Sequence, residues 1–370
     1  MKEKICIIIS TPFQLISAFS IVEQNAEFES DLYIIGNFKN YQNVADKVRK
    51  TGIFANVVTY SLNDIRIGQQ SKNAVFRAAM RQISYMSYER SGRKIALYDR
   101  KYSRVYFAAA VSAAELIMYF QKHYKPEFYL FDDGVMTYRD IKWVNGEGEK
   151  FKTIKKLIYR CIGMPKPHIV VYSPVLFNSM YPKGEKVNEL QVISERAKEF
   201  LCDIFDVSSE DIFDQPVTVI ECKVSDYLTD ESSEILENIY EQIIEKTGIQ
   251  NIVFKRHPRD SRTPIAGREY LEGTVPFELF SCIDDLTNKV LVAWDSTAVL
   301  TPKLFYNQEP TIVLLYKLVE GKINNFEQTD RLYREFKEIY TDKTKFIIPE
   351  TEQELKAAIT IIMEKCNAKG

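Results

Sequence analysis

The sequence has few of the residues that hold metal ions in structural sites. It contains only three histidines, His123, His168 and His257, and none of its six cysteines forms a Cys-x-x-Cys pair. Because zinc sites need clustered cysteines and histidines at short spacings, the sequence does not predict one. Most cysteines lie in apolar segments, so we expect buried free thiols in a reducing compartment.

An excess of either charge is also missing. The chain has 49 lysines and arginines against 51 aspartates and glutamates, a formal net charge of −2. Nucleic-acid-binding domains usually show a strong basic excess, so we expect no nucleic-acid partner. Segments 90–104 and 145–166 are locally basic, and the second is amphipathic. A solvated helix face is the simplest interpretation, and contact with an anionic membrane surface or a charged acceptor is the alternative.

Long apolar runs are absent as well. No stretch approaches the roughly 20 apolar residues needed to cross a bilayer. The apolar run near the start covers only Ile5–Ile9, and Pro12 and Gln14 follow at once, which predicts a first β-strand rather than a signal sequence. We therefore expect a soluble cytoplasmic protein, with peripheral contact at the cytoplasmic face of the membrane as a further option.

Short apolar runs and helical patterns alternate along most of the chain. Strands are predicted at 4–9, 31–35, 105–108, 128–131, 217–221, 249–254, 290–293 and 311–314. Helices are predicted at 40–50, 73–90, 112–123, 230–247, 296–305 and 351–366. This alternation is typical of parallel sheets covered by helices on both faces.

The length of 370 residues suggests two domains of ordinary size. We predict an α/β protein of two Rossmann-like, doubly wound halves, residues 1–170 and 216–370, the second with a C-terminal helix. Residues 171–215 are predicted to form the linker region. In such sheets ligands bind beyond the carboxyl ends of the strands, so we expect the site in a crevice between the halves.

The loop after the predicted strand 249–254 concentrates positive charge. Lys255, Arg256 and His257 are followed by Pro258, which stiffens the backbone. Fixed cations beside one titratable imidazole suit a phosphate that must be held and then released. An ordinary surface turn is the alternative interpretation.

Two more segments could serve a nucleotide. Ser296 and Thr297 follow a predicted strand and begin a predicted helix, where N–H groups and hydroxyls form an anion site, although both residues are also ordinary helix caps. Glu278 begins another helix, where a carboxylate can accept ribose hydroxyls or simply favour the helix dipole. Neither segment matches the phosphate-loop or dinucleotide fingerprints, so nucleoside triphosphates and nicotinamide cofactors lose support.

Three aspartates are candidates for proton transfer. Asp132 and Asp133 precede Gly134 at the end of a predicted strand, where one carboxylate can act as a general base beside the other. A plain turn is the alternative. Asp230 lies between a strand and a helix, and helix capping is its simpler interpretation.

Taken in order, five segments resemble one family. They are Ser10–Leu15, Asp132–Gly134, Lys255–Pro258, Pro276–Glu278 and Ser296–Thr297. In this combination the chain resembles the bacterial sialyltransferases, most closely glycosyltransferase family 52, whose members modify lipooligosaccharide and capsule. The resemblance runs over most of the chain.

The resemblance implies a GT-B fold, in which two Rossmann-like domains face each other across a cleft. The first domain would bind the glycan acceptor and the second the nucleotide-sugar donor. It further implies an inverting transfer from CMP-sialic acid to a sugar hydroxyl, with a terminal galactose as the expected acceptor, without metal or cofactor. By family analogy a homodimer is expected.

Residue roles follow from the same resemblance. His257 would contact the CMP phosphate as general acid or cationic stabiliser, and Ser296 and Thr297 would hold that phosphate. Lys255 and Pro258 would border the cytosine, and Glu278 would bind the ribose. Asp133 is the expected base, with Asp230 as the alternative. The remaining candidates near the site are Thr11, Gln14 and Asp132.

Arg256 departs from the family pattern, and the resemblance assigns it no purpose. Two other functions compete with sialyl transfer. A GT-B glycosyltransferase could use another donor, such as UDP-glucose or CMP-Kdo, because function does not follow from fold alone. A non-catalytic nucleotide-sugar-binding protein of a polysaccharide operon would keep the fold without the chemistry.

Overall fold

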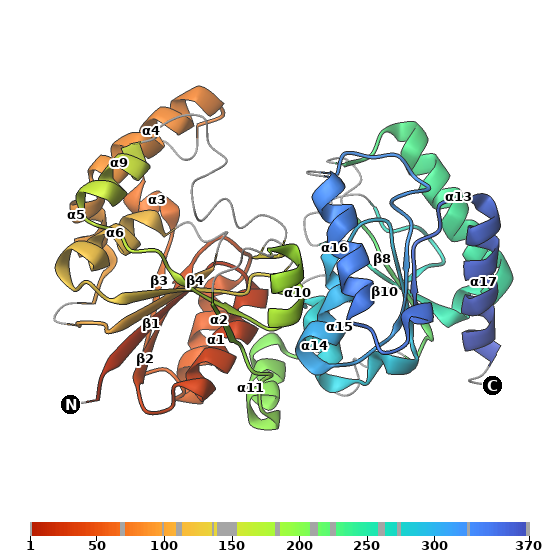
Figure 1. Cartoon of the computed structure of the whole chain (residues 1–370), viewed down its shortest axis with the longest axis horizontal. Helices are drawn as coiled ribbons and strands as arrows, with labels where there is room; N and C mark the ends of the chain where they lie inside the picture. Colours follow the sequence, from red (N-terminus) through yellow and green to blue (C-terminus); the bar gives the residue numbers. More distant parts are fainter. Residues whose placement is uncertain are drawn as a thin grey trace. The chain divides into compact units, whose positions relative to one another are not determined.

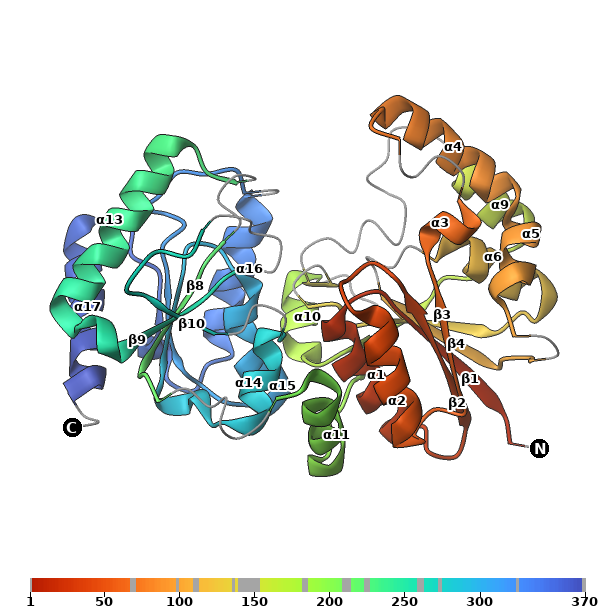
Figure 2. The ribbon, with the colours of Figure 1, turned by 180° about the vertical axis from the view of Figure 1, so that it is seen from behind.

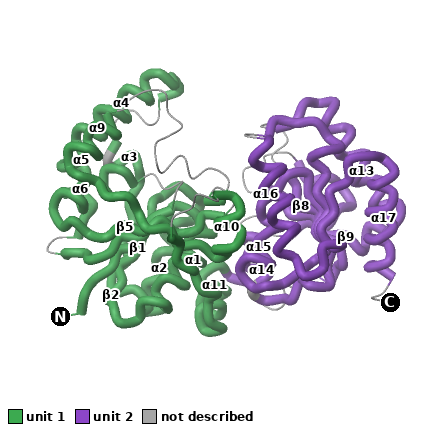
Figure 3. The backbone as a smooth tube through the Cα atoms, in the orientation of Figure 1, with its two compact units in different colours: residues 1–205 green, residues 206–370 purple. Residues whose placement is uncertain are grey.

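The computed structural model contains two compact units, Met1–Phe205 and Asp206–Gly370, coloured separately in Figure 3. It describes residues 2–66, 71–97, 100–108, 113–134, 137–138, 154–181, 186–207, 214–222, 227–257, 263–271, 275–323 and 326–367. Each unit is built on its own parallel sheet.

The first unit contains a seven-stranded sheet in which every neighbouring pair is parallel. Its spatial order is β3 (Asn56–Tyr60), β2 (Glu29–Ile35), β1 (Lys4–Ile9), β4 (Arg104–Ala108), β5 (Glu127–Phe131), β6 (His168–Val171) and β7 (Val187–Glu189). The strand β1 is buried from Ile5 to Ile9, as expected for a strand covered on both faces.

Helices cover both faces of this sheet (Figures 1 and 2). One layer contains α1 (Pro12–Gln24), α2 (Tyr41–Thr51) and α11 (Glu195–Phe205). The other contains α4 (Ala74–Met86), α5 (Tyr88–Ile95), α6 (Ala114–His123) and α9 (Ile154–Cys161). Two shorter helices complete the described part of this unit, α3 (Leu62–Ile65) and α10 (Pro174–Met180).

The second unit contains a six-stranded parallel sheet. Its order is β10 (Glu269–Tyr270), β9 (Ile252–Lys255), β8 (Val217–Ile220), β11 (Val290–Ala293), β12 (Thr311–Leu314) and β13 (Phe346–Ile347). On one face α13 (Asp230–Thr247) packs against α17 (Glu352–Asn367). The other face carries α14 (Phe277–Ile283), α15 (Thr301–Tyr306) and α16 (Phe326–Glu338). The described residues of this unit also form the 3₁₀ turns η2 (Ile249–Asn251), η3 (Leu286–Asn288), η4 (Thr297–Leu300) and η5 (Lys343–Lys345).

The predicted fold class of two doubly wound α/β halves is confirmed. In each sheet the first strand in sequence lies in the interior, and the chain builds outward from it in both directions. The strand order therefore reverses between β1 and β4 in the first sheet, and between β8 and β11 in the second. At such a reversal the loops that follow neighbouring strands run to opposite faces of the sheet and leave a crevice for a ligand. The candidate segments follow strands close to these two points.

Two predicted helices are interrupted in the structure. The single helix expected at 73–90 is wrong, because α4 ends at Met86 and α5 begins at Tyr88 and turns Gly92 toward α6. A Cβ at Gly92 would lie 2.3 Å from the Cβ of Tyr119, so the close packing of α5 on α6 requires glycine. The helix expected at 296–305 is the turn η4 followed by α15, which restarts beside Pro302 because proline has no N–H to continue the earlier turn.

The region predicted as a linker, 171–215, carries regular structure of its own. It holds α10, β7 and α11, and β7 is the edge strand of the first sheet. The first compact unit extends through α11 to Phe205.

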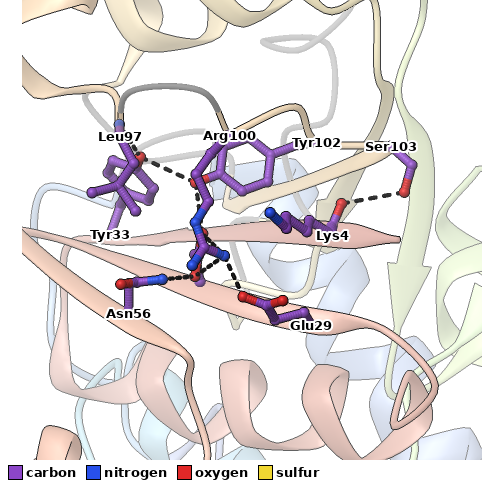
Figure 4. Close-up of polar contacts among 9 residues, drawn as sticks. Lys4, Glu29, Tyr33, Asn56, Leu97, Arg100, Tyr102 and Ser103 are labelled. Atoms are coloured by element: carbon purple, nitrogen blue, oxygen red, sulfur yellow. Dashed lines mark hydrogen bonds and ion pairs between the residues drawn. The ribbon is translucent and has the colours of Figure 1, made fainter. Parts of the chain in front are cut away.

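A buried polar cluster lies near the amino ends of the strands in the first sheet (Figure 4). The Asp31 carboxylate accepts hydrogen bonds from Asn56 and Tyr102, each at 2.8 Å, and lies 3.3 Å from the Arg100 guanidinium. Arg100 also pairs with Glu29. Burial raises the pKa of Asp31, and these donors oppose that shift. The cluster holds the segment before β4 against β2, at the end of the strands opposite to the candidate residues.

Candidate active site

The first group of candidate residues joins the loops after β1 and β5. Thr11 caps α1 with its side chain, which accepts a hydrogen bond of 3.3 Å from the Gln14 N–H, and Pro12 occupies the first turn. Ser10 and Thr11 both precede the helix, and Thr11 is the residue that caps it. The capping places Gln14 in the first turn of the helix, with its side chain fully buried.

Gln14 connects these two loops. Its Nε2 donates to Asp133 Oδ1 at 2.6 Å, and its Oε1 accepts from the Ser10 N–H at 2.6 Å. A backbone N–H can only donate, so the bond from Ser10 decides which end of the amide is the oxygen. The Nε2 is thereby directed at the half-buried Asp133, which must accept. The site therefore orients the Asp133 carboxylate through a buried amide.

Asp132 has a different environment from its neighbour. Its carboxylate is fully buried and accepts from the Gly134 N–H at 2.9 Å, from the Tyr172 N–H at 3.2 Å and from the Tyr138 hydroxyl. Burial raises the pKa of Asp132 to about 7, although the three donors oppose the shift. Gly134 has a φ of 73°, the left-handed region that glycine adopts without strain. Asp132 thus anchors the turn that presents Asp133.

Sequence reasoning missed the residues that complete this anchor. Tyr138 and Tyr172 are ordinary aromatic residues in sequence, 6 and 40 positions beyond Asp132. One signal was present, because Ser173-Pro174 after β6 repeats the pattern of Thr11-Pro12 after β1. Ser173 caps α10, and its N–H donates to the Tyr138 hydroxyl at 3.1 Å.

The second group of candidates lies in the second unit, beginning with the basic loop. Lys255 is the last residue of β9 and is buried, with its ammonium 5.9 Å from the centre of the Phe280 ring. His257 follows two residues later and is half-buried. Pro258 lies outside the described residues. The loop therefore offers an imidazole near the carboxyl end of the sheet, with the lysine set deeper.

The structure accounts for Arg256, which the resemblance left without a purpose. Its guanidinium lies 4.0 Å from the buried Glu221 carboxylate and 5.9 Å from the centre of the Tyr270 ring. Arg268 approaches the same glutamate at 3.9 Å. Arg256 thus helps to balance a buried carboxylate beside β8 and β10, a structural role.

Glu278 lies in the first turn of α14 and is electrostatically coupled to Lys255. Burial raises the pKa of Glu278, and the charge of Lys255 lowers it in part. The two residues come from segments more than twenty positions apart, and the fold brings them together. A carboxylate held near a buried lysine can accept hydrogen bonds from the hydroxyl groups of a sugar.

Ser296 and Thr297 lie at the start of η4, after β11. Ser296 precedes the turn but makes no side-chain capping bond, and Thr297 is exposed. The capping interpretation of Ser296 is therefore wrong, and its hydroxyl is not used by the helix. The turn has one four-residue 3₁₀ segment, so its dipole is weaker than that of the long helix that the sequence predicted.

The preceding residues hold this loop from behind. Trp294 is buried and donates from Nε1 to the Val319 carbonyl at 2.9 Å, and Asp295 accepts from the hydroxyl of Tyr333 on α16. A Cβ on Gly321 would lie 2.2 Å from the Trp294 ring, so glycine is required there. Sequence reasoning did not identify Tyr333, because nothing local links it to β11.

Asp230 is exposed in the first turn of α13. The capping interpretation belongs instead to Thr229, whose hydroxyl oxygen accepts from the Ser232 N–H at 3.1 Å. Asp230 thus carries an exposed carboxylate after β8, next in the sheet to β9. In the described parts of the chain, no three His, Cys, Asp or Glu side chains are grouped to hold a metal ion. Within the same parts, no helix is long and apolar enough to span a membrane.

The structure thus gathers the candidates into two groups. Thr11, Gln14, Asp132 and Asp133 belong to the first unit. The second unit holds the others that are described, namely Asp230, Lys255, His257, Glu278, Ser296 and Thr297.

Solved structures with the same architecture include enzymes of nucleotide sugars. UDP-GlcNAc 2-epimerase of Methanocaldococcus jannaschii is 14% identical, with a TM-score of 0.55 over 97% of this chain and 92% of that one. A UDP-glucosyltransferase from Polygonum tinctorium is 10% identical, with a TM-score of 0.51 over 99% of both chains. At these identities the likeness shows the fold alone, which is GT-B. Two proteins with different reactions share it, so the fold does not choose the chemistry.

The sequence itself supplies the narrower class. With the GT-B fold, its match to a family model makes the protein a glycosyltransferase. Residues 5–315 match the model described as alpha-2,8-polysialyltransferase (POLYST), and the chain belongs to this family. The match supports the predicted bacterial sialyltransferase class, while the closer resemblance to family 52 stays a prediction. A comparison with curated proteins finds no match.

Proposed function

We propose that this protein is an inverting, metal-independent sialyltransferase that uses CMP-sialic acid. The observation that carries the proposal is the position of the basic loop and the hydroxyl loop. His257 follows β9 and Ser296 follows β11, and β8 alone separates these two strands in the sheet. The family match spans both loops.

In this proposal the second unit stabilises the leaving group. CMP departs with its phosphate negatively charged, and His257 with the hydroxyls of Ser296 and Thr297 neutralises that charge. Loss of one preorganised interaction of this kind typically lowers the rate by ~10²–10³-fold. Lys255 and Pro258 border the cytosine, and Glu278 accepts hydrogen bonds from the ribose hydroxyls.

Asp133 takes the proton of the acceptor hydroxyl. A positioned carboxylate contributes roughly 10²–10⁴-fold to such a step. The hydrogen bond from Gln14 supports Asp133 over Asp230, because it orients the carboxylate. Asp230 remains the alternative base.

Two acceptors fit the proposal. The resemblance to lipooligosaccharide and capsule enzymes suggests a terminal galactose of a bacterial surface glycan. The family description, alpha-2,8-polysialyltransferase, suggests a terminal sialic acid. Release of CMP from CMP-sialic acid in excess EDTA, with lactose or oligosialic acid, distinguishes them. Turnover of UDP-glucose or CMP-Kdo instead would replace the donor, and nucleotide binding without any turnover would favour a non-catalytic protein.

The central test is His257→Ala. We expect this variant to lose nearly all transfer, because the charge on the departing phosphate is no longer neutralised, while thermal unfolding stays unchanged. His168→Ala is the matched control, since this exposed histidine begins β6 at the opposite end of the strand from the site. Near-normal turnover by a folded His257→Ala protein would contradict the assignment.

A further inference from the structure

The helix α4 carries an apolar face that no described part of the chain covers. Val75 is 79% exposed, Met86 61%, Phe76 47% and Ile83 45%. At about 100° per residue these four side chains fall within an arc of about 100°, together with the exposed Ala79. They form one continuous apolar stripe, which we call the α4 face.

The opposite side of α4 already satisfies the core. Ser84 and Tyr85 are buried, and Tyr85 belongs to an apolar cluster with Met118 of α6. The helix α9 packs on the same cluster through Ile154 and Ile158. The α4 face is therefore not needed to hold the helix in place. Of the ten large apolar side chains that are exposed in the described chain, five lie on α4 and α9, the fifth being Leu157.

Positive charge is concentrated on α4 and on the two helices that pack with it. The helices α4, α5 and α9 carry eight lysines and arginines and a single acidic residue, Glu89, in a chain whose net charge is −2. Glu89 is already paired with Lys122 and His123. The helix α5 adds an open hollow of about 420 Å³ lined by Glu89, Arg90, Arg93 and Lys94. The three helices lie together in both views of the ribbon (Figures 1 and 2).

We propose that α4 and α9 dock the protein onto an anionic phospholipid surface. Exposed apolar side chains flanked by basic ones are typical of helices that lie in the plane of a membrane interface. The apolar side chains enter the acyl boundary, and the arginines and lysines contact lipid phosphates. A soluble polyanion would use the charges but would leave Val75 and Met86 in water. The proposal for this surface is independent of the sialyl transfer proposed above.

The test is flotation of the full-length protein with vesicles of phosphatidylcholine alone or mixed with phosphatidylglycerol. We expect binding to the mixed vesicles, weakened by salt. The pair Val75→Ser and Met86→Ser lowers binding about tenfold or more, because two apolar side chains no longer leave water. The pair Arg93→Gln and Arg160→Gln, exposed on α5 and α9, lowers it about fivefold per arginine. Ile235→Ser on α13 and Lys356→Gln on α17 are the matched controls, exposed helical positions in the second unit, and leave binding unchanged.

Two outcomes would overturn the proposal. One is a lack of binding to the mixed vesicles. The other is binding that the arginine variants lose but the Val75 and Met86 variants retain, and that soluble oligosialic acid displaces. That second result would assign the basic surface to an anionic glycan. Circular dichroism of each variant confirms that the surface substitutions leave the fold intact.

Discussion

Gln14 and Asp132 both support the Asp133 carboxylate, but they do so in different ways. Gln14 reaches Asp133 through a side-chain hydrogen bond, whereas Asp132 holds the backbone turn that carries Asp133. Both are fully buried. A substitution of either residue therefore alters the proposed base, although neither side chain is proposed to contact the substrate. The pH dependence of activity tests Gln14, and the pH dependence of stability tests Asp132.

Gln14→Glu tests the orientation of Asp133. The substitution keeps the shape of the side chain but places a second carboxyl group beside Asp133, which raises the pKa of the base. We expect the acid limb of the kcat/KM profile to move to higher pH by about one unit or more. Gln24→Glu, exposed at the end of α1, is the control and leaves the profile unchanged. An unchanged profile in Gln14→Glu, with activity lost in Asp230→Asn but not in Asp133→Asn, would identify Asp230 as the base.

Asp132 makes stability depend on pH. Its pKa is raised to about 7 by burial, so the folded protein holds this proton more tightly than the unfolded chain, where aspartate titrates near ~3.9. The stabilising contribution is complete below about pH 4 and is lost as the pH rises through about 7. We expect the difference in unfolding free energy between wild type and Asp132→Asn to shrink over this interval, measured by urea denaturation. A difference that is constant with pH would show that Asp132 does not titrate there.

At the scale of elements, α16 supports the loop after β11. Tyr333 is buried on α16, and its hydroxyl donates to Asp295, the residue before Ser296. The helix begins thirty residues after this loop, so its contribution depends on packing rather than on local sequence. The proposed phosphate site therefore needs a neighbouring helix for its geometry.

Tyr333→Phe removes only the hydroxyl of this contact. We expect KM for the nucleotide donor to rise about tenfold while the acceptor KM stays unchanged, because the Ser296 loop loses a fixed position. Tyr340→Phe is a matched control, since the buried Tyr340 hydroxyl has no hydrogen-bond partner among the described residues. Equal effects of the two substitutions on donor KM, or none for Tyr333→Phe, would show that the hydroxyl does not position the loop.

At the scale of the whole molecule, each unit has its own sheet and core. The second sheet draws all six strands from residues 217–347, and none from the first unit. The described residues proposed to bind the donor also come from this unit alone. The unit thus has its own core and carries the described residues to which we assign nucleotide binding.

A fragment of residues 206–370 should fold by itself and bind CMP. We expect one cooperative thermal transition and an affinity for CMP within a few-fold of that of the full chain, by calorimetry, but no sialyl transfer, because Asp133 is absent. The fragment with Ser296→Ala and Thr297→Ala is the control and should bind CMP more weakly. A folded fragment without affinity for CMP, beside a full chain that binds it, would show that the first unit supplies part of the nucleotide site.

Much of the fold was predictable because its signals are local. The helix Asp230–Thr247 begins and ends as predicted, since Gly248 at a φ of 82° stops it. The strands Lys4–Ile9 and Val290–Ala293 match their apolar runs for the same reason. The break at Ser87 was not predictable, because the sequence on both sides favours helix and only packing on α6 turns the chain.

The amino-acid sequence alone was enough to predict the alternation of strands and helices, the loops that carry His257, Ser296 and Asp133, and the sialyltransferase class. Apolar periodicity, glycine, proline and motif order are properties of neighbouring residues, so they can be interpreted without a fold. The partners of the buried polar groups, in contrast, depend on how the chain packs in three dimensions. Gln14 and Asp133 are 119 positions apart, and Tyr333 and Asp295 are 38 apart. A hydrogen bond depends on distance and direction in space, and these become defined only when both sheets have formed.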